Sequence, residues 1–154
     1  MKKISKILLL VATFFLVAGC GNKKIDLKNA SLEDIMAKVY EKVPEEKTPM
    51  MLENIPVTKE NVVDYLGCEI EFEEALASES MTGSIAHSVV LVRTKPNADI
   101  EKIKKDIKEN VNPRKWICVG IERDEVEVLS KDNIIIMIIA EEEREDLVKG
   151  FKEL

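Results

Sequence analysis

The sequence contains few of the residues that build catalytic or metal-binding centres. It has one histidine, three cysteines and six glycines among 154 residues. No two cysteines have the close CxxC spacing that is typical of a zinc site, and no glycine-rich loop is present that would hold a phosphate group. We therefore expect no metal ion and no other cofactor, and we predict no catalytic residue from a local motif.

Positive charge is outweighed by negative charge, with 23 lysine and arginine residues against 29 aspartate and glutamate residues. The formal net charge is −6, and it falls by three to −9 if Lys2, Lys3 and Lys6 are lost with an N-terminal leader. Binding to DNA or RNA depends on clustered positive charge, so this balance excludes nucleic acid as a partner. The same acidity argues against a basic patch that would hold the chain on a membrane surface without another anchor.

No apolar run at the N-terminus reaches the length of about 20 residues that a transmembrane helix requires. The run over residues 7–17 follows a basic start and is followed by small residues. A basic start, a short apolar core and a small-residue exit are typical of a secretory signal peptide. We predict such a peptide over residues 1–19, with an uncleaved anchor as the alternative.

The motif Leu16-Val17-Ala18-Gly19-Cys20 closely resembles the lipobox of bacterial lipoproteins. The resemblance implies cleavage between Gly19 and Cys20, with lipid carried on Cys20 at the new N-terminus. Two long acyl chains hold a protein at a membrane far more firmly than one chain. The expected location is therefore the extracytoplasmic face of the cell membrane, with the membrane itself as a partner through the lipid.

The remaining chain divides into a short tether and one domain. We predict that residues 20–30 are the lipidated cysteine and a polar tether, and that residues 31–154 form a single α+β domain. A mature part of about 135 residues is long enough to bury a core. Helices are expected over residues 31–43, 58–65, 98–111 and 141–154, and strands over 70–73, 85–94, 116–119, 126–128 and 134–140.

The order of these elements favours a mostly antiparallel sheet of about five strands packed against helices. Ser31 is a plausible N-cap of the first helix, with Asp34 three residues later. The continuously apolar run from 89 to 92 is typical of a central strand that is covered on both faces. Met50 and Met51 are expected in the core, although paired methionines also suit a ligand-binding surface.

Cys68 and Cys118 remain once Cys20 is assigned to lipid. Outside the cytosol such a pair forms a disulfide in many proteins; the alternative is two buried free thiols. His87 is the only histidine, and a pairing with Cys68 or Cys118 would supply a nucleophile and a base. The neighbouring Ser88 does not form such a pair with His87, because adjacent strand residues point to opposite faces.

Arg114, Lys115 and Trp116 form the cluster that best suits ligand contact. A tryptophan beside two cations stacks on a sugar or a peptide in many binding sites. The alternative is that Trp116 anchors the junction between a helix and a strand in the core.

Three segments of the chain resemble a family of uncharacterised lipoproteins from clostridia-like Gram-positive bacteria. They are the early helix with Ile35 and Tyr40-Glu41, the strand of residues 87–92 followed by an isoleucine- and lysine-rich helix, and the stretch of residues 113–119. The family carries only a domain of unknown function, so the resemblance implies a lipoprotein and no substrate.

These observations lead to one expectation and one alternative. We expect a lipid-anchored extracytoplasmic protein that is not an enzyme and that binds a small ligand or an envelope protein at the cell surface. The alternative is a small cell-envelope enzyme that uses Cys68 or Cys118 with His87.

Overall fold

The computed structural model describes residues 24–154. The predicted signal peptide, its cleavage at Gly19 and the predicted lipidation at Cys20 lie outside the described residues. The described elements are α1 Leu32–Tyr40, β1 Leu52–Pro56, α2 Val62–Leu66, β2 Phe72–Ser80, β3 Ser88–Thr94, α3 Ile100–Asn110, β4 Glu127–Lys131, β5 Ile134–Ile139 and α4 Arg144–Lys152, with 3-10 helices at Glu45–Lys47 and Arg123–Glu125. Across this range, none of the helices has the length and apolar character needed to cross a membrane.

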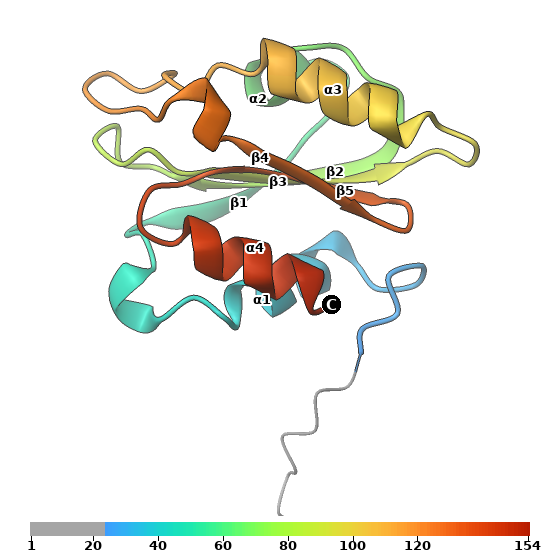
Figure 1. Ribbon diagram of the computed structural model, residues 1–154, viewed down its shortest axis with the longest axis horizontal. Coiled ribbons are helices and arrows are strands. Elements are labelled where there is room, and N and C mark those ends of the chain that lie inside the picture. The colour runs from blue at the N-terminus through green and yellow to red at the C-terminus, as the bar shows by residue number, and fades with distance from the viewer. Residues whose placement is uncertain (1–23) are drawn as a thin grey trace, which may run out of the picture.

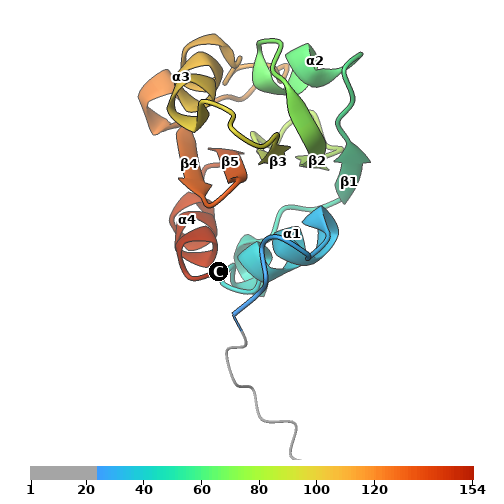
Figure 2. The same cartoon turned by 90° about the vertical axis from the view of Figure 1, so that its right-hand side faces the viewer.

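The strands form one antiparallel sheet of five strands in the order β1-β2-β3-β5-β4. Helices α1 and α4 cover one face of the sheet, and α2 and α3 cover the other (Figures 1 and 2). The predicted α+β class and the antiparallel sheet of five strands are therefore confirmed.

Each face of the sheet has its own apolar core. Along β3, Val89 and Leu91 pack under α1 and α4, whereas Val90 and Val92 pack under α2 and α3. Every residue of β5 is fully buried. Both strands are continuously apolar because they lie at the centre of the sheet and are covered on both sides.

The start of α1 is capped as predicted. The side chain of Ser31 accepts a hydrogen bond from the Asp34 amide at 3.1 Å, which confirms the predicted N-cap of α1.

Helices α1 and α4 are in close contact. On α4, Gly150 lies against the backbone of α1, and a Cβ atom there would come within 2.1 Å of the Val39 carbonyl oxygen. Glycine at this position therefore sets how closely the two helices approach.

Part of the predicted tether is packed against the domain. Leu27 is buried in the core under α1 and α4. The guanidinium of Arg93 donates to the carbonyl oxygens of Leu27 and Ala30, at 2.6 and 2.7 Å. An apolar side chain and a buried cation thus hold this part of the segment in place.

Two details of the predicted strands are wrong. Residues 116–119 form no strand: Trp116 and Val119 pack against the core, but Ile117 is 91% exposed. The fifth strand is instead β1, which the sequence did not suggest because it contains Pro56 and two polar residues. Proline is tolerated on an edge strand, and β1 is an edge strand.

Strand β2 is longer than predicted, and the residues just before β1 are more exposed. Residues 78–80, which lie outside the predicted strands, continue β2 and pair with β1. Met50 and Met51 are each 68% exposed, so their predicted place in the core is wrong.

Candidate functional site

Polar side chains gather at the end of the sheet where β2 finishes and β3 begins. His87 and Ser88 lie next to each other in the chain and point to opposite faces of the sheet, as predicted for strand residues. Each is fully buried, and each belongs to a separate hydrogen-bond network. One network lies under α1 and α4, and the other under the loop that follows α3.

The first network joins Tyr40, Ser78, His87 and Glu143. The Tyr40 hydroxyl lies 2.6 Å from Nε2 of His87 and 3.1 Å from Oγ of Ser78. Nδ1 of His87 contacts Oε1 of Glu143, so both ring nitrogens are engaged. Glu143 is 4% exposed and His87 has no exposure. A buried carboxylate against a buried imidazole fixes the orientation of the ring and, through it, of the Tyr40 hydroxyl.

Burial raises the pKa of Tyr40 above its ordinary value. The hydrogen bond to Ser78 acts in the opposite direction, and the carboxylates of Glu143 and Glu79 add to the rise. The hydroxyl therefore keeps its proton at neutral pH. It is held as a neutral group that donates one hydrogen bond and accepts others.

This network borders a pocket of about 290 Å³ between α1 and the first two strands. Its lining combines apolar residues with Tyr40 and Ser78 and with two further polar residues. The lining residues are Glu33, Met36, Ala37, Tyr40, Leu52, Asn54 and Ser78. We refer to this cavity as the α1–β1 pocket. Apolar walls with a few fixed polar groups are typical of ligand sites.

The second network joins Glu79, Ser88 and Lys115 on the opposite face. Nζ of Lys115 lies 2.9 Å from Oε1 of Glu79 and 3.2 Å from Oγ of Ser88, and Ser88 also donates to Glu79. The ammonium group lies over the rings of Tyr65 and Trp116, at 5.2 and 5.3 Å from their centroids. The ammonium group of Lys115 is thus surrounded by a carboxylate, a hydroxyl and two aromatic faces. We refer to this arrangement as the closed network.

The predicted ligand cluster of Arg114, Lys115 and Trp116 is therefore divided by the structure. Lys115 points inward to Glu79, and Trp116 packs against the core under α2 and α3. The exposed side chain of Arg114 pairs with Glu122. The three side chains do not converge on one surface, and the role that best fits Trp116 is the anchoring alternative.

The two described cysteines are free thiols, and neither is bonded to His87. Cys68 is half-buried beside α3, and its burial raises the pKa of the thiol. Its Sγ lies 3.7 Å from the Leu66 carbonyl oxygen. Cys118 is exposed in the loop after α3. The disulfide alternative is not formed in this structure, and the ring nitrogens of His87 are occupied by Tyr40 and Glu143.

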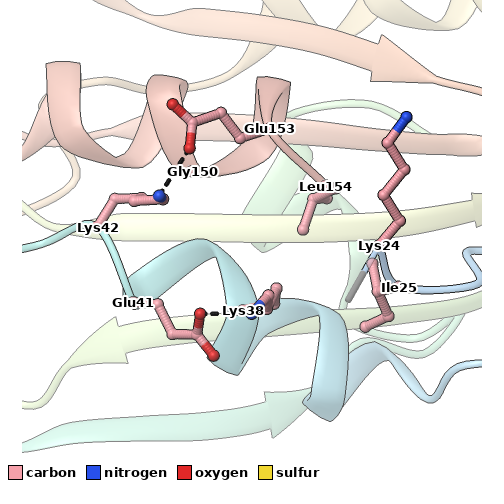
Figure 3. Close-up of a pocket in the computed structure, with 8 residues that line it drawn as sticks. All are labelled: Lys24, Ile25, Lys38, Glu41, Lys42, Gly150, Glu153 and Leu154. Atoms are coloured by element: carbon pink, nitrogen blue, oxygen red, sulfur yellow. Dashed lines mark hydrogen bonds and ion pairs between the residues drawn. The ribbon is translucent and has the colours of Figure 1, made fainter. Parts of the chain in front are cut away.

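A second pocket, of about 270 Å³, lies between α1 and the end of α4 (Figure 3). Lys42 pairs with Glu153 across it at 2.6 Å, and Lys38 pairs with Glu41 at the same distance. Lys24 and Ile25 border it from the N-terminal segment. These two ion pairs engage four of the five charged residues of its lining, so most of the charged groups of this pocket are already paired with one another.

Residues 24–154 bring together no group of three or more histidine, cysteine, aspartate or glutamate side chains in an arrangement suited to a metal ion. Comparison of the chain with protein-family models, with curated proteins and with solved structures finds no match in any of the three. The site is therefore interpreted from its own geometry.

Sequence reasoning identified His87 but missed its partners. Tyr40 lies 47 positions before it and Glu143 lies 56 positions after it. The sequence did indicate that His87 has partners, because a histidine at the start of a buried apolar strand needs a hydrogen-bond partner for each ring nitrogen. The sequence alone does not identify which tyrosine and which glutamate supply them.

Proposed function

We propose that this chain is a lipid-anchored extracytoplasmic protein that binds a ligand or partner in the α1–β1 pocket and is not an enzyme. The observation that carries the binding role is the Tyr40 hydroxyl. Tyr40 lines a pocket with apolar walls, and its hydroxyl is held by His87, whose other ring nitrogen contacts the buried Glu143. Polar groups that are fixed before binding lose little entropy when a ligand arrives.

The chemistry of the described side chains favours binding over catalysis. Ser88 has no exposure, and its hydroxyl is engaged by Glu79 and Lys115. The Cys68 thiol has a raised pKa and no basic partner in hydrogen-bond contact. A nucleophile needs a base within hydrogen-bond reach, and neither thiol is arranged in this way.

Support for the membrane address comes from the sequence alone, from the lipobox-like motif that ends at Cys20. The test is phase partitioning of the protein made in its native host. The wild-type chain is expected in the detergent phase, and the Cys20→Ser chain in the aqueous phase. Cys118→Ser changes an exposed thiol outside the motif and serves as the matched control. Detergent partitioning that survives Cys20→Ser would overturn the anchor.

The pocket is tested with a photoreactive amino acid at position 37, which is exposed and lines the α1–β1 pocket. The control carries the same amino acid at position 105, an exposed site on α3 across the sheet. Irradiation of intact cells is expected to give an adduct at 37 and none at 105. The mass of the adduct separates a small ligand from a protein partner. Equal labelling at both positions, or none at 37, would contradict the proposed site.

A further inference from the structure

We propose that the outer edge of β1, together with the α1–β1 pocket, binds an extended and positively charged segment of a partner protein as an added strand. This inference rests on the proposed function, because it names the occupant of the same pocket. It is supported by the backbone groups of β1, by the side chains beside them and by the charge along this edge.

The backbone of β1 offers unpaired groups at its outer edge. The Met81 amide donates to the Met51 carbonyl, and the Val57 amide donates to the Ala75 carbonyl. Alternate residues of an antiparallel strand bond to the same neighbour, so residues 51, 53, 55 and 57 face β2. Leu52 and Asn54 therefore direct their N–H and C=O groups outward, where β1 has no neighbouring strand.

The exposed edge is short and ends at a defined residue. Pro56 has no N–H group, and its carbonyl accepts a hydrogen bond from the Asn61 side chain at 3.3 Å. The edge thus offers two donors and two acceptors, at Leu52 and Asn54. This is enough to align a short extended segment, while the proline limits further growth of the sheet.

The side chains of the same two residues line the α1–β1 pocket. Side chains alternate along a strand, so one set of side chains of an added strand would lie on the α1 side, next to Met36 and Ala37. Peptides that add to a sheet edge gain affinity from main-chain bonds and specificity from alternate side chains in pockets. The pocket and the edge therefore suit one extended occupant.

The charge at this edge favours a cationic partner. Glu33 on α1 and Glu53 on β1 are exposed, and neither belongs to an ion pair within residues 24–154. Met50 and Met51 add exposed, adaptable apolar surface just before the strand. A second copy of this chain would place like charges along the same pair of edges, which is unfavourable.

The test uses a fluorescent seven-residue peptide of alternating lysine and valine and the full lipidated chain in detergent micelles, with anisotropy as the readout. The wild-type chain is expected to bind this peptide and not its glutamate–valine counterpart. Glu53→Lys is expected to weaken binding roughly tenfold through charge reversal. Glu101→Lys, an equal charge change at an exposed site on α3, is the matched control and is expected to leave binding unchanged.

Main-chain pairing is tested separately. N-methylation of alternate peptide residues is expected to abolish binding when it blocks one set of amides and to be tolerated when it blocks the other set. Asn54→Pro removes an outward N–H group and is expected to weaken binding, whereas Asn54→Ala keeps that group and is expected to retain it. The amides of Leu52 and Asn54 are expected to gain protection from hydrogen exchange when the peptide binds.

The outcomes separate this inference from the function on which it rests. Binding that tolerates both sets of N-methyl groups, or that ignores Glu53→Lys, would overturn the added strand. So would a failure of the lysine–valine peptide to bind. The proposed function would still stand if position 37 is labelled in cells, and an adduct of small mass would identify a small ligand. If position 37 is not labelled in cells, both the proposed binding site and the added strand are overturned.

Discussion

The two faces of one end of the sheet use buried polar groups in different ways. On the α1 side, His87 and Glu143 hold the hydroxyl of Tyr40, a residue that lines the α1–β1 pocket. On the other side, Lys115 lies over two aromatic rings and closes the contact between Ser88 and Glu79. Both networks satisfy their buried groups, but only the first includes residues, Tyr40 and Ser78, that line the α1–β1 pocket. Burial of polar side chains is therefore not enough to mark a site, and an adjoining pocket is also needed.

The largest expected effect comes from His87→Ala. This change leaves the buried carboxyl group of Glu143 without its hydrogen-bond partner and removes a fully buried ring, at a combined cost of about 3–4 kcal/mol of unfolding free energy. Ser88→Ala removes one hydrogen bond while Glu79 keeps Lys115, at a cost of about 1 kcal/mol. Urea unfolding of both variants measures the difference. Equal losses would show that the two networks contribute alike.

Gly150→Ala tests how α1 is held over the pocket. A Cβ atom at this position meets the Val39 carbonyl at 2.1 Å, so α1 and α4 must move apart, at a cost of about 2–3 kcal/mol. The yield of labelling at position 37 should also fall in Gly150→Ala, because α1 forms one wall of the pocket. Gly83→Ala is the control, since a Cβ atom there has no neighbour within 4 Å. A stable Gly150→Ala chain would contradict the close helix contact.

Lys115→Met probes the closed network. Glu79 would lose its ion pair but keep the hydrogen bond from Ser88, so the expected loss is about 1–2 kcal/mol. Thermal unfolding provides the measurement. Binding in the α1–β1 pocket should not change, because Lys115 lies on the opposite face of the sheet. A loss of binding without a loss of stability would mean that the two faces are coupled.

The smallest expected effect is a pH dependence of stability that comes from Tyr40. Its pKa is raised in the folded chain, so its contribution is fully present below its ordinary pKa near 10 and is lost as the pH rises further. Tyr40→Phe lacks this ionisation. The difference in unfolding free energy between wild type and Tyr40→Phe should therefore narrow above pH 10. A constant difference from pH 8 to 11 would exclude Tyr40 as the titrating group.

Much of the fold could be predicted from local patterns. Ser31 with Asp34 marks the start of α1, and Gly67 ends α2 in the left-handed conformation, with a φ of 75°. The apolar runs of β3 and β5 indicate central strands because only a doubly covered strand buries both faces. Each of these patterns involves residues that are close together in the sequence, so it can be recognised without knowledge of the tertiary structure.

The errors arise where tertiary context decides. Strand β1 has a weak pattern because an edge strand needs only one partner and tolerates Pro56. Residues 116–119 form a loop instead of a strand: Trp116 and Val119 pack against the core, and Ile117 is exposed. From the sequence, only His87 indicated the site. Its partners are far from it in the chain: Tyr40 lies before the first strand and Glu143 after the last.

The two tyrosines of this chain give the most direct test of the central claim, which is that the α1–β1 pocket is the binding site. Tyr40 belongs to the open network and Tyr65 to the closed one. The measurement is the yield of the adduct at position 37 in cells that carry Tyr40→Phe or Tyr65→Phe. We expect a yield about tenfold lower for Tyr40→Phe, since the buried hydrogen bonds that fix this side chain beside the pocket are lost, and an unchanged yield for Tyr65→Phe. Equal yields in the two variants would contradict the claim.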